Sequence, residues 1–443
     1  MSAQTETTRV LEAWIASGGD TVGEAGEAWV DAQRREALAR VRDQGIPTAK
    51  QEAWRYTGLK ALLAQPFSPV TEALTAVEPE DLEDVLVPGL DAFRAVLVNG
   101  RFIPQLSDLD GLPAGVRAGG FQEVLRERPD ALQARLNQLA GEESRLFSEL
   151  NTAGLDDGFV LLADQGARVE RPIELIHLSV GMDEPRVAQP RHLIALESDS
   201  RARIVERYVS LGDSLYCTNS VLEVWLGDKA ALDHDRIQEE SLNAFHITAL
   251  YLSQGRSSRY HGVNLGVGAS WARSDLVVRF RGEGAECDLR GLYLVGDGQV
   301  MDYHVDVDHA VPGCASREGF KGIVYGKGRA VFDGRIHVAT DAQKTDAHLT
   351  NDNLLLSRNA EVDTKPQLEI FADDVKCSHG TTVGQIEPEA LFYLRSRGIA
   401  APLARRMLCL GFAGDVIDSV GSEPLREYVT HQLGAYLAEA PLD

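Results

Sequence analysis

A thiol and an imidazole lie two residues apart at Cys377 and His379, within the segment DDVKCSHG that spans 373–380. Side chains at i and i+2 of an extended chain point to the same face, so these two groups would lie side by side. Both are ligands for borderline and soft transition metals. Lys376 and His379 would also lower the pKa of the Cys377 thiol if all three side chains were exposed together. The pair is the first candidate for a metal-binding site.

A second set of polar side chains alternates along the chain at Asp302, His304, Asp306 and Asp308. The positions between them are apolar, so the four side chains would share one face of a strand. Such a face can hold a divalent cation, or it can be a solvated row of negative charge. We favour the solvated face, because carboxylates are mostly exposed. His309, the next residue, is interpreted as structural.

The five cysteines are odd in number and widely spaced, and no two of them form a C-x-x-C pair. This pattern differs from a secreted disulfide framework, a zinc ribbon and a ferredoxin-type cluster site. We expect mostly free thiols, with three cysteines buried in strands and one near the apolar stripe of a C-terminal helix. In addition to Cys377, the cysteines are Cys217, Cys287, Cys314 and Cys409.

The composition excludes several classes of protein. With 67 acidic and 44 basic residues, the net charge of −23 argues against a nucleic-acid-binding surface. The first residues have no apolar signal-peptide core, and no apolar run approaches the roughly 18 residues of a membrane span. No phosphate-binding G-x-x-x-x-G-K-[ST] loop is present. We expect a soluble cytoplasmic protein.

The chain of 443 residues divides into three parts by pattern. Residues 1–155 are predicted to be mostly helical, with helices near Val10–Ile15 and over 26–44 and a hairpin that turns at Asn99-Gly100. Residues 156–385 contain short β-branched and apolar runs separated by turns, typical of a sandwich, a barrel or a β-solenoid. Residues 386–443 are helical again. Their apolar stripes are Leu403, Met407 and Leu410, then Leu425, Val429, Leu433 and Tyr436, and buried core is their default interpretation.

Two segments resemble the SufB/SufD family, whose members form the scaffold on which bacteria assemble iron–sulfur clusters. One is GIPTAKQEAWRYT at 45–57, and the other is the block from Asn351 to Phe412 that includes CSHG at 377–380. The resemblance implies a mainly β fold, with a right-handed parallel β-helix core between N-terminal and C-terminal helical domains. It also implies that His379 takes part in cluster building at an interface with SufB, and that Cys377 has a secondary role.

Two departures place the chain on the SufD side of this resemblance. SufB carries a cysteine six positions before the proline that matches Pro366, and this chain has Ala360 there. SufB also reads EHEA where this chain reads CSHG. A methyl group neither ligates iron nor carries sulfur, so the alternative of a SufB-like primary scaffold, which needs a thiol at 360, is disfavoured.

The resemblance implies a non-catalytic scaffold subunit, with a transient iron–sulfur cluster shared with SufB and no permanent cofactor. It would pair with SufB along the β-helix edges and dock the ATPase SufC on its C-terminal helices. Arg395, Arg397, Arg405 and Arg406 lie in that docking region and are candidate partner-binding residues. The sequence leaves open whether the isolated chain forms a homodimer. The alternative function is a β-helix polysaccharide lyase or hydrolase, whose paired carboxylates would come from the Asp302–Asp308 row.

Overall fold

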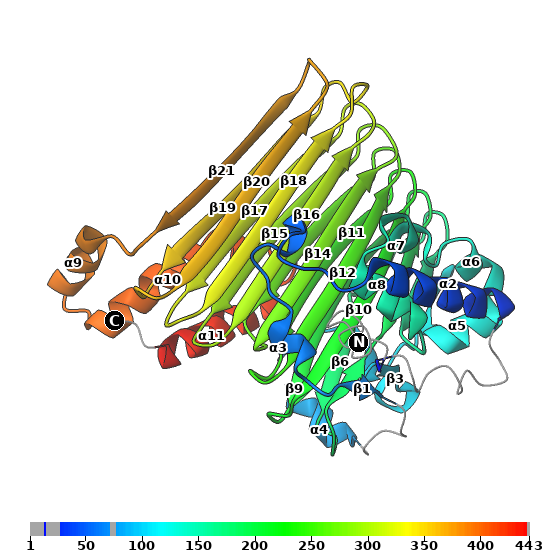
Figure 1. Cartoon of the computed structure of the whole chain (residues 1–443), viewed down its shortest axis with the longest axis horizontal. Helices are drawn as coiled ribbons and strands as arrows, with labels where there is room; N and C mark the ends of the chain where they lie inside the picture. Colours follow the sequence, from blue (N-terminus) through cyan, green and yellow to red (C-terminus); the bar gives the residue numbers. More distant parts are fainter. Residues whose placement is uncertain (1–12, 15–26, 71–76, 441–443) are drawn as a thin grey trace.

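The computed structural model describes residues 13–14, 27–70 and 77–440. Two large sheets face each other along the molecule, with a hydrophobic core between them. Successive strands alternate between the sheets, and each long strand pairs in parallel with the strand two positions later in the chain. Figure 1 shows the strands stacked as a ribbon with helices at both ends of the chain. This architecture is a parallel β-helix, so the fold class implied by the resemblance is confirmed.

We call the two sheets sheet A and sheet B. Sheet A has eleven strands among the described residues: β1 (Ser68–Pro69), β4 (Val116–Gly120), β5 (Phe159–Ala163), β7 (Arg186–Ala188), β8 (Arg191–Leu196), β10 (Tyr216–Leu226), β12 (Phe245–Gln254), β14 (Trp271–Phe280), β16 (Val300–His309), β18 (Arg329–Val338) and β20 (Glu361–Ile370). Sheet B has ten: β2 (Phe93–Val98), β3 (Arg101–Phe102), β6 (Ile173–Val180), β9 (Arg201–Leu211), β11 (Ala231–Glu239), β13 (Arg259–Gly266), β15 (Glu286–Val295), β17 (Ala315–Val324), β19 (Asp346–Leu355) and β21 (Lys376–Gly384).

Alternation along each strand builds the core between the two sheets. Leu276, Val278 and Phe280 of β14 are fully buried there, as their spacing predicted. Parallel pairing places equivalent residues of successive strands directly above one another, so each inward position forms a column that runs through the solenoid. A sequence period could not identify this fold, because the turns between strands vary in length.

The predicted hairpin forms the start of sheet B. Asn99 and Gly100 have φ values of 47° and 84°, which suits a two-residue turn between antiparallel β2 and β3. β2 also pairs in parallel with β6, so the hairpin extends the sheet and does not stand apart from it.

Short helices cover one face of sheet A near its beginning (Figure 1). The helix predicted over 26–44 is α2 (Ala28–Gln44), which ends at Gly45. It packs beside α8 (Leu146–Ala153), where Arg40 Nε donates to Glu149 Oε1 at 2.8 Å. The helix predicted near Val10–Ile15 lies largely outside the described residues. The others on this face are η1 (Glu52–Trp54), α3 (Lys60–Leu63), α5 (Phe121–Glu127), α6 (Pro129–Gln133) and α7 (Gln138–Glu143). Two further helices, α4 (Pro79–Glu83) and η2 (Pro104–Leu106), pack against sheet B.

The segment 46–57, which we call the strap, crosses the outer face of sheet A. Arg273 lies over the Trp54 ring at 3.9 Å from its centroid and donates to the Ala53 carbonyl at 2.9 Å. Further along, Lys365 of β20 donates to Glu52 Oε1 at 2.6 Å. The strap therefore joins the N-terminal segment to the last strand of sheet A.

The C-terminal helices are α9 (Pro388–Ser396), α10 (Ala401–Asp418) and α11 (Glu423–Glu439). Leu425, Val429 and Leu433 of α11 are buried against the outer face of sheet B, so the predicted core stripe of this helix is confirmed. Within the described residues, no helix has both the length and the apolar character that a membrane crossing requires.

Candidate functional site

The last strands of the two sheets, β20 and β21, form what we call the terminal rung, residues 361–384. Each pairs with a strand on one side only, β18 for β20 and β19 for β21, and Figure 1 shows no strand beyond them. Their free edges expose backbone donors and acceptors that can pair with another chain. Apolar side chains are exposed on the same rung: Ile370 is 38% exposed, Phe371 61% and Val383 49%.

The structure brings Cys377 and His379 together on this rung. Both belong to β21, and they stand in register with Ala347 and Leu349 of β19, whose side chains are fully buried in the core. The predicted pair therefore continues two interior columns to the open end of the β-helix. Cys377 is half-buried and packs against the core, while His379 is exposed.

Burial raises the pKa of the Cys377 thiol, and the nearby carboxyl groups of Asp346 and Glu318 raise it further. The expected lowering by Lys376 is absent, because that condition required an exposed thiol and the alternate residues of β21 point to the opposite face. Cys377 is therefore a protonated thiol at neutral pH, and the more accessible ligand of the pair is the imidazole of His379.

The remaining cysteines are free and buried, as predicted. Burial raises the pKa of Cys409 to about 11 and that of Cys217 and Cys287 well above the ordinary value. Cys314 is buried as well. These thiols are unreactive core residues at neutral pH.

The Asp302–Asp308 row differs from both of its predicted interpretations. Asp302 is fully buried, with Arg273 Nη1 at 2.9 Å and His304 Nε2 at 2.9 Å. The other two carboxylates are also paired, with arginine or histidine side chains of neighbouring strands. For Asp306 the partners are Arg279 at 3.2 Å and Arg335 at 3.1 Å, and for Asp308 the partner is His337 at 2.6 Å.

The row is neither a solvated face nor a set of free metal ligands, because arginine and histidine side chains of the neighbouring strands already pair with its carboxylates. The prediction of a solvated face is wrong for this reason. A polysaccharide-cleaving enzyme would need an acid and a base free to act on substrate, and these carboxylates are held in ion pairs. His309 is buried, with Nε2 at 2.9 Å from Ser316 Oγ, in agreement with its structural interpretation.

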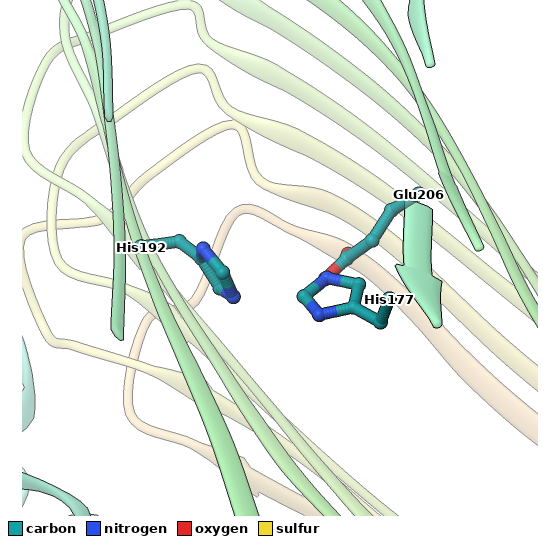
Figure 2. A group of neighbouring side chains, drawn as sticks. All are labelled: His177, His192 and Glu206. Atoms are coloured by element: carbon teal, nitrogen blue, oxygen red, sulfur yellow. The ribbon is translucent and has the colours of Figure 1, made fainter. Parts of the chain in front are cut away.

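A buried cluster of His177, His192 and Glu206 was missed by the sequence analysis. The three residues come from β6, β8 and β9, and one candidate ligand atom from each lies within 4.8 Å of the others. Figure 2 shows the two imidazoles facing each other inside the β-helix with the carboxylate beside His177. The only signal in the sequence was a polar residue at an inward position of each strand, which periodicity alone does not relate across strands.

Hydrogen bonds already involve His192 and Glu206 of this cluster, whereas the His177 ring makes none within the described residues, its Nε2 lying 3.5 Å from Glu206 Oε1. The Phe159 N–H donates to His192 Nδ1 at 3.0 Å, so the ring proton of neutral His192 is on Nε2, which then has no lone pair for a metal. Glu206 accepts from the Tyr208 hydroxyl at 2.6 Å, from Arg236 Nε at 2.8 Å and from His234 Nε2 at 3.0 Å. Burial lowers the pKa of both His177 and His192. We interpret the cluster as a structural ion-pair network.

A second exposed surface lies on the C-terminal helices. We call Phe392, Tyr393, Leu403 and Met407 the C-terminal face; their exposed fractions are 72%, 57%, 48% and 44%. The default prediction of buried core is therefore wrong for Leu403 and Met407. The candidate arginines flank this face: Arg395 and Arg397 are exposed, and Arg405 and Arg406 are half-buried.

Comparison with known protein families agrees with the two resembling segments. Residues 178–412 match the family model described as "SUF system FeS cluster assembly, SufBD core domain", and residues 13–175 match that of the "SufBD protein N-terminal region". Together the two models cover nearly all of the described residues.

Curated relatives are similar over most of their length. The iron–sulfur cluster assembly protein SufD of Escherichia coli is 33% identical over 413 residues, which is 91% of this chain and 92% of the relative. A SufBD family protein of Synechocystis is 33% identical over 85% of this chain and 84% of its own. The chloroplastic protein ABCI7 of Arabidopsis thaliana is 31% identical over 90% of this chain and 86% of its own.

Proposed function

Because this chain belongs to the SufBD family of iron–sulfur cluster assembly proteins, we propose that it is a SufD-like scaffold subunit without catalytic activity of its own. It assembles and passes on clusters together with a SufB-like partner and a SufC-like ATPase. The cluster is cargo, held for a time between the two scaffold subunits and then released. The observation that carries this proposal is the position of His379 at the open end of the β-helix.

The ligand chemistry of His379 suits a cluster that is bound for a time and then transferred. Its imidazole is exposed on a strand whose free edge can receive another subunit. A neutral imidazole ligates iron and carries no charge that would hold the cluster as a thiolate does. Cys377 lies beside it as a protonated, half-buried thiol, and we assign it the secondary role. Ala360, also near this end, offers no ligand atom, so the thiolates of the site come from the partner.

The terminal rung is the proposed contact with the SufB-like subunit. Two free strand edges and the exposed side chains of Ile370, Phe371 and Val383 combine backbone pairing with apolar burial. The same surface supports a homodimer when the chain is isolated.

The C-terminal face is the proposed dock for the ATPase. Phe392, Leu403 and Met407 supply exposed apolar area, and the four flanking arginines supply positive charge on a chain of net charge −23. Aromatic, methionine and arginine side chains are the residue types enriched where proteins bind one another.

The test is anaerobic cluster reconstitution on the chain co-purified with its SufB-like and SufC-like partners. His379→Ala should abolish the visible absorption of the cluster and its transfer to an acceptor, with the complex still assembled. The matched control is His348→Ala, since His348 lies on the neighbouring strand but bonds to Asp346 and Ser378. Full cluster formation with His379→Ala would contradict the proposed site.

A further inference from the structure

Glu318 is a buried acid without an ion-pair partner, and it lies beneath the terminal rung. It points inward from β17, the residue is 2% exposed, and neither carboxyl oxygen makes a hydrogen bond of normal geometry within the described residues, although the Ser316 hydroxyl is near. Burial of an unsatisfied polar group is unfavourable, so native proteins rarely retain one without a use for it.

The other buried glutamates in the described residues differ from Glu318, since each lies against a cation or a histidine. Their partners lie at distances of 2.6 to 3.2 Å: Arg40 for Glu149, Arg207 for Glu174, Arg236 for Glu206, Arg191 for Glu223 and His246 for Glu240. Glu318 is therefore the one buried glutamate among the described residues that has no ion-pair partner.

Its position connects it with the candidate iron site. Parallel register places Leu289, Glu318, Leu349 and His379 in one interior column, so the acid lies two strand spacings from the imidazole with only β19 between them. At a strand spacing of about 4.8 Å this is a separation of about 10 Å. The neighbouring column contains Cys287, Ser316, Ala347 and Cys377.

The groups around Glu318 leave it neutral in the empty protein. Burial raises its pKa to about 8, opposed by the Ser316 hydroxyl and the Arg317 charge and supported by Asp288. An ionised Glu318 raises the pKa of the Cys287 and Cys377 thiols, and both thiols are protonated at neutral pH. From β16, His309 lies near Ser316, and burial lowers its pKa to about 4, so it brings no positive charge.

We propose that Glu318 is the buried counter-charge for iron held at the terminal rung: near neutral pH it is an uncharged acid in the iron-free protein and releases its proton to solvent when iron binds. This inference rests on the proposed function and adds a residue to the same site. Glu318 is a positioning residue for charge, since β19 lies between it and the ligands.

The proton balance is simple and involves no electron transfer. The O–H bond of the Glu318 carboxyl breaks, its electron pair stays on the carboxylate, and the proton goes to buffer. A carboxylate about 10 Å from a bound unit of net charge +1, at an effective dielectric constant of about 20, strengthens binding roughly tenfold. The effect vanishes well below pH 8, where the acid stays protonated.

The experiment measures ferrous iron affinity of the co-purified complex by competition with a chromophoric chelator, at pH 6.5 and pH 8.5. Glu318→Gln should weaken binding about tenfold at pH 8.5 and leave it unchanged at pH 6.5. The variant is isosteric and removes a buried acid, so its melting temperature at pH 8.5 should equal or exceed that of the wild type. The matched control is Glu369→Gln, because Glu369 is on β20 but exposed and paired with Arg335.

Each outcome decides one of the two ideas. Equal iron affinity of Glu318→Gln and wild type at both pH values overturns the inference, while sensitivity to His379→Ala leaves the proposed function intact. A loss of the same size at both pH values, or with a lowered melting temperature, shows a structural role for Glu318 and also overturns it. Iron binding that is insensitive to His379→Ala contradicts the proposed function itself.

Discussion

At the scale of single residues, the two members of the candidate ligand pair have different environments on one strand. His379 is exposed at the open end, and Cys377 is a half-buried thiol whose pKa is raised by burial. On the neighbouring strand β19, Ala347 is in register with Cys377 and Leu349 with His379. The pair therefore differs in accessibility and protonation even though its members share a face.

This difference predicts unequal effects of two substitutions. His379→Ala should lower the iron affinity of the assembled complex at least about tenfold. Loss of a group that merely supports a metal ligand already costs about tenfold or more in affinity, and loss of the ligand itself should cost no less. Cys377→Ala should have a smaller effect, because its thiol must first lose a proton. Chelator competition at pH 7.5 measures both, and an equal loss in the two variants would show that Cys377 is an equal ligand.

The Glu206 network makes a prediction about stability. Glu206→Gln leaves Arg236 buried without its counter-charge, which should lower the free energy of unfolding by about 3–5 kcal/mol. Denaturant unfolding measures this change. The control is Asp228→Asn, whose ion pair with Arg256 is exposed and should contribute less than about 1 kcal/mol. Similar losses in the two variants would contradict the importance of the buried network.

Sequence reasoning succeeded for residues whose neighbours are close in the chain and failed for those whose neighbours are distant. The shared face of Cys377 and His379 follows from strand periodicity alone. The environment of the Asp302–Asp308 row does not, because Arg273 and Arg335 reach it from the strands on either side. The burial of Cys377 depends on Ala347 in the same way, through a register that the sequence does not reveal.

At the scale of elements, His261 connects β13 to the C-terminal helices. Its Nε2 donates to the Ser419 carbonyl at 2.9 Å, and its Nδ1 faces Asp288. The hydrogen bond to Asp288 raises the pKa of His261 to about 9, and the carbonyl of Ser419 contributes. The folded-state pKa is above the unfolded value, so this contact stabilises the protein fully below about pH 6.5, and the stabilisation disappears as the pH rises through about 9.

Hydrogen exchange of α10 and α11 should therefore accelerate between pH 8 and pH 10, after correction for the intrinsic pH dependence of exchange. His261→Gln should exchange faster at pH 7 and lose this pH dependence. The helices α5 and α6, remote from His261, provide the internal reference. Unchanged protection of α10 and α11 across this range would contradict a role for protonated His261.

The exposed stripe of α10 predicts a docking defect without a folding defect. Met407→Asp should weaken binding of the ATPase subunit roughly tenfold or more, since a buried methionine contributes about 1.5–3 kcal/mol. The variant should unfold like the wild type, because Met407 is 44% exposed in the free chain. Arg405→Glu with Arg406→Glu should also weaken docking, more strongly at low salt.

Calorimetric titration with the purified ATPase subunit measures both effects. Thr430→Asp on the exposed side of α11 serves as the control. If Met407→Asp binds with wild-type affinity, the C-terminal face is not the dock. The sequence suggested core for this stripe because α10 has an amphipathic pattern, and pattern alone does not show whether another chain completes the core.

At the scale of the whole molecule, the β-helix is open at the terminal rung, and the exposed Phe371 adjoins this edge. Phe371→Asp should weaken association with the SufB-like subunit, and any homodimer, at least about tenfold. Leu242→Asp is the control, because Leu242 is similarly exposed in a turn away from this end. Sedimentation velocity measures the association, and an undiminished complex would mean that pairing uses another surface.

The overall architecture followed from the resemblance more than from the pattern of the sequence. Alternation predicted strands, turns and the hairpin at Asn99-Gly100, and it left sandwich, barrel and solenoid open. The decision among them depends on which strands pair, and parallel neighbours here are about thirty residues apart. The strap and β20 are still farther apart in the sequence, by 313 positions from Glu52 to Lys365, so no local sequence pattern predicts their contact.

The strap also sets an order of events during synthesis. Each coil of the solenoid pairs with the coil before it, so the β-helix can form progressively as the chain leaves the ribosome. Glu52, made early, meets Lys365 only after 313 further residues have been added. The strap can therefore contact Arg273 of β14 first, and its contact with β20 must wait until most of the chain has been translated. Lys365 precedes β21, so this contact can form shortly before or as the strand that carries His379 is added.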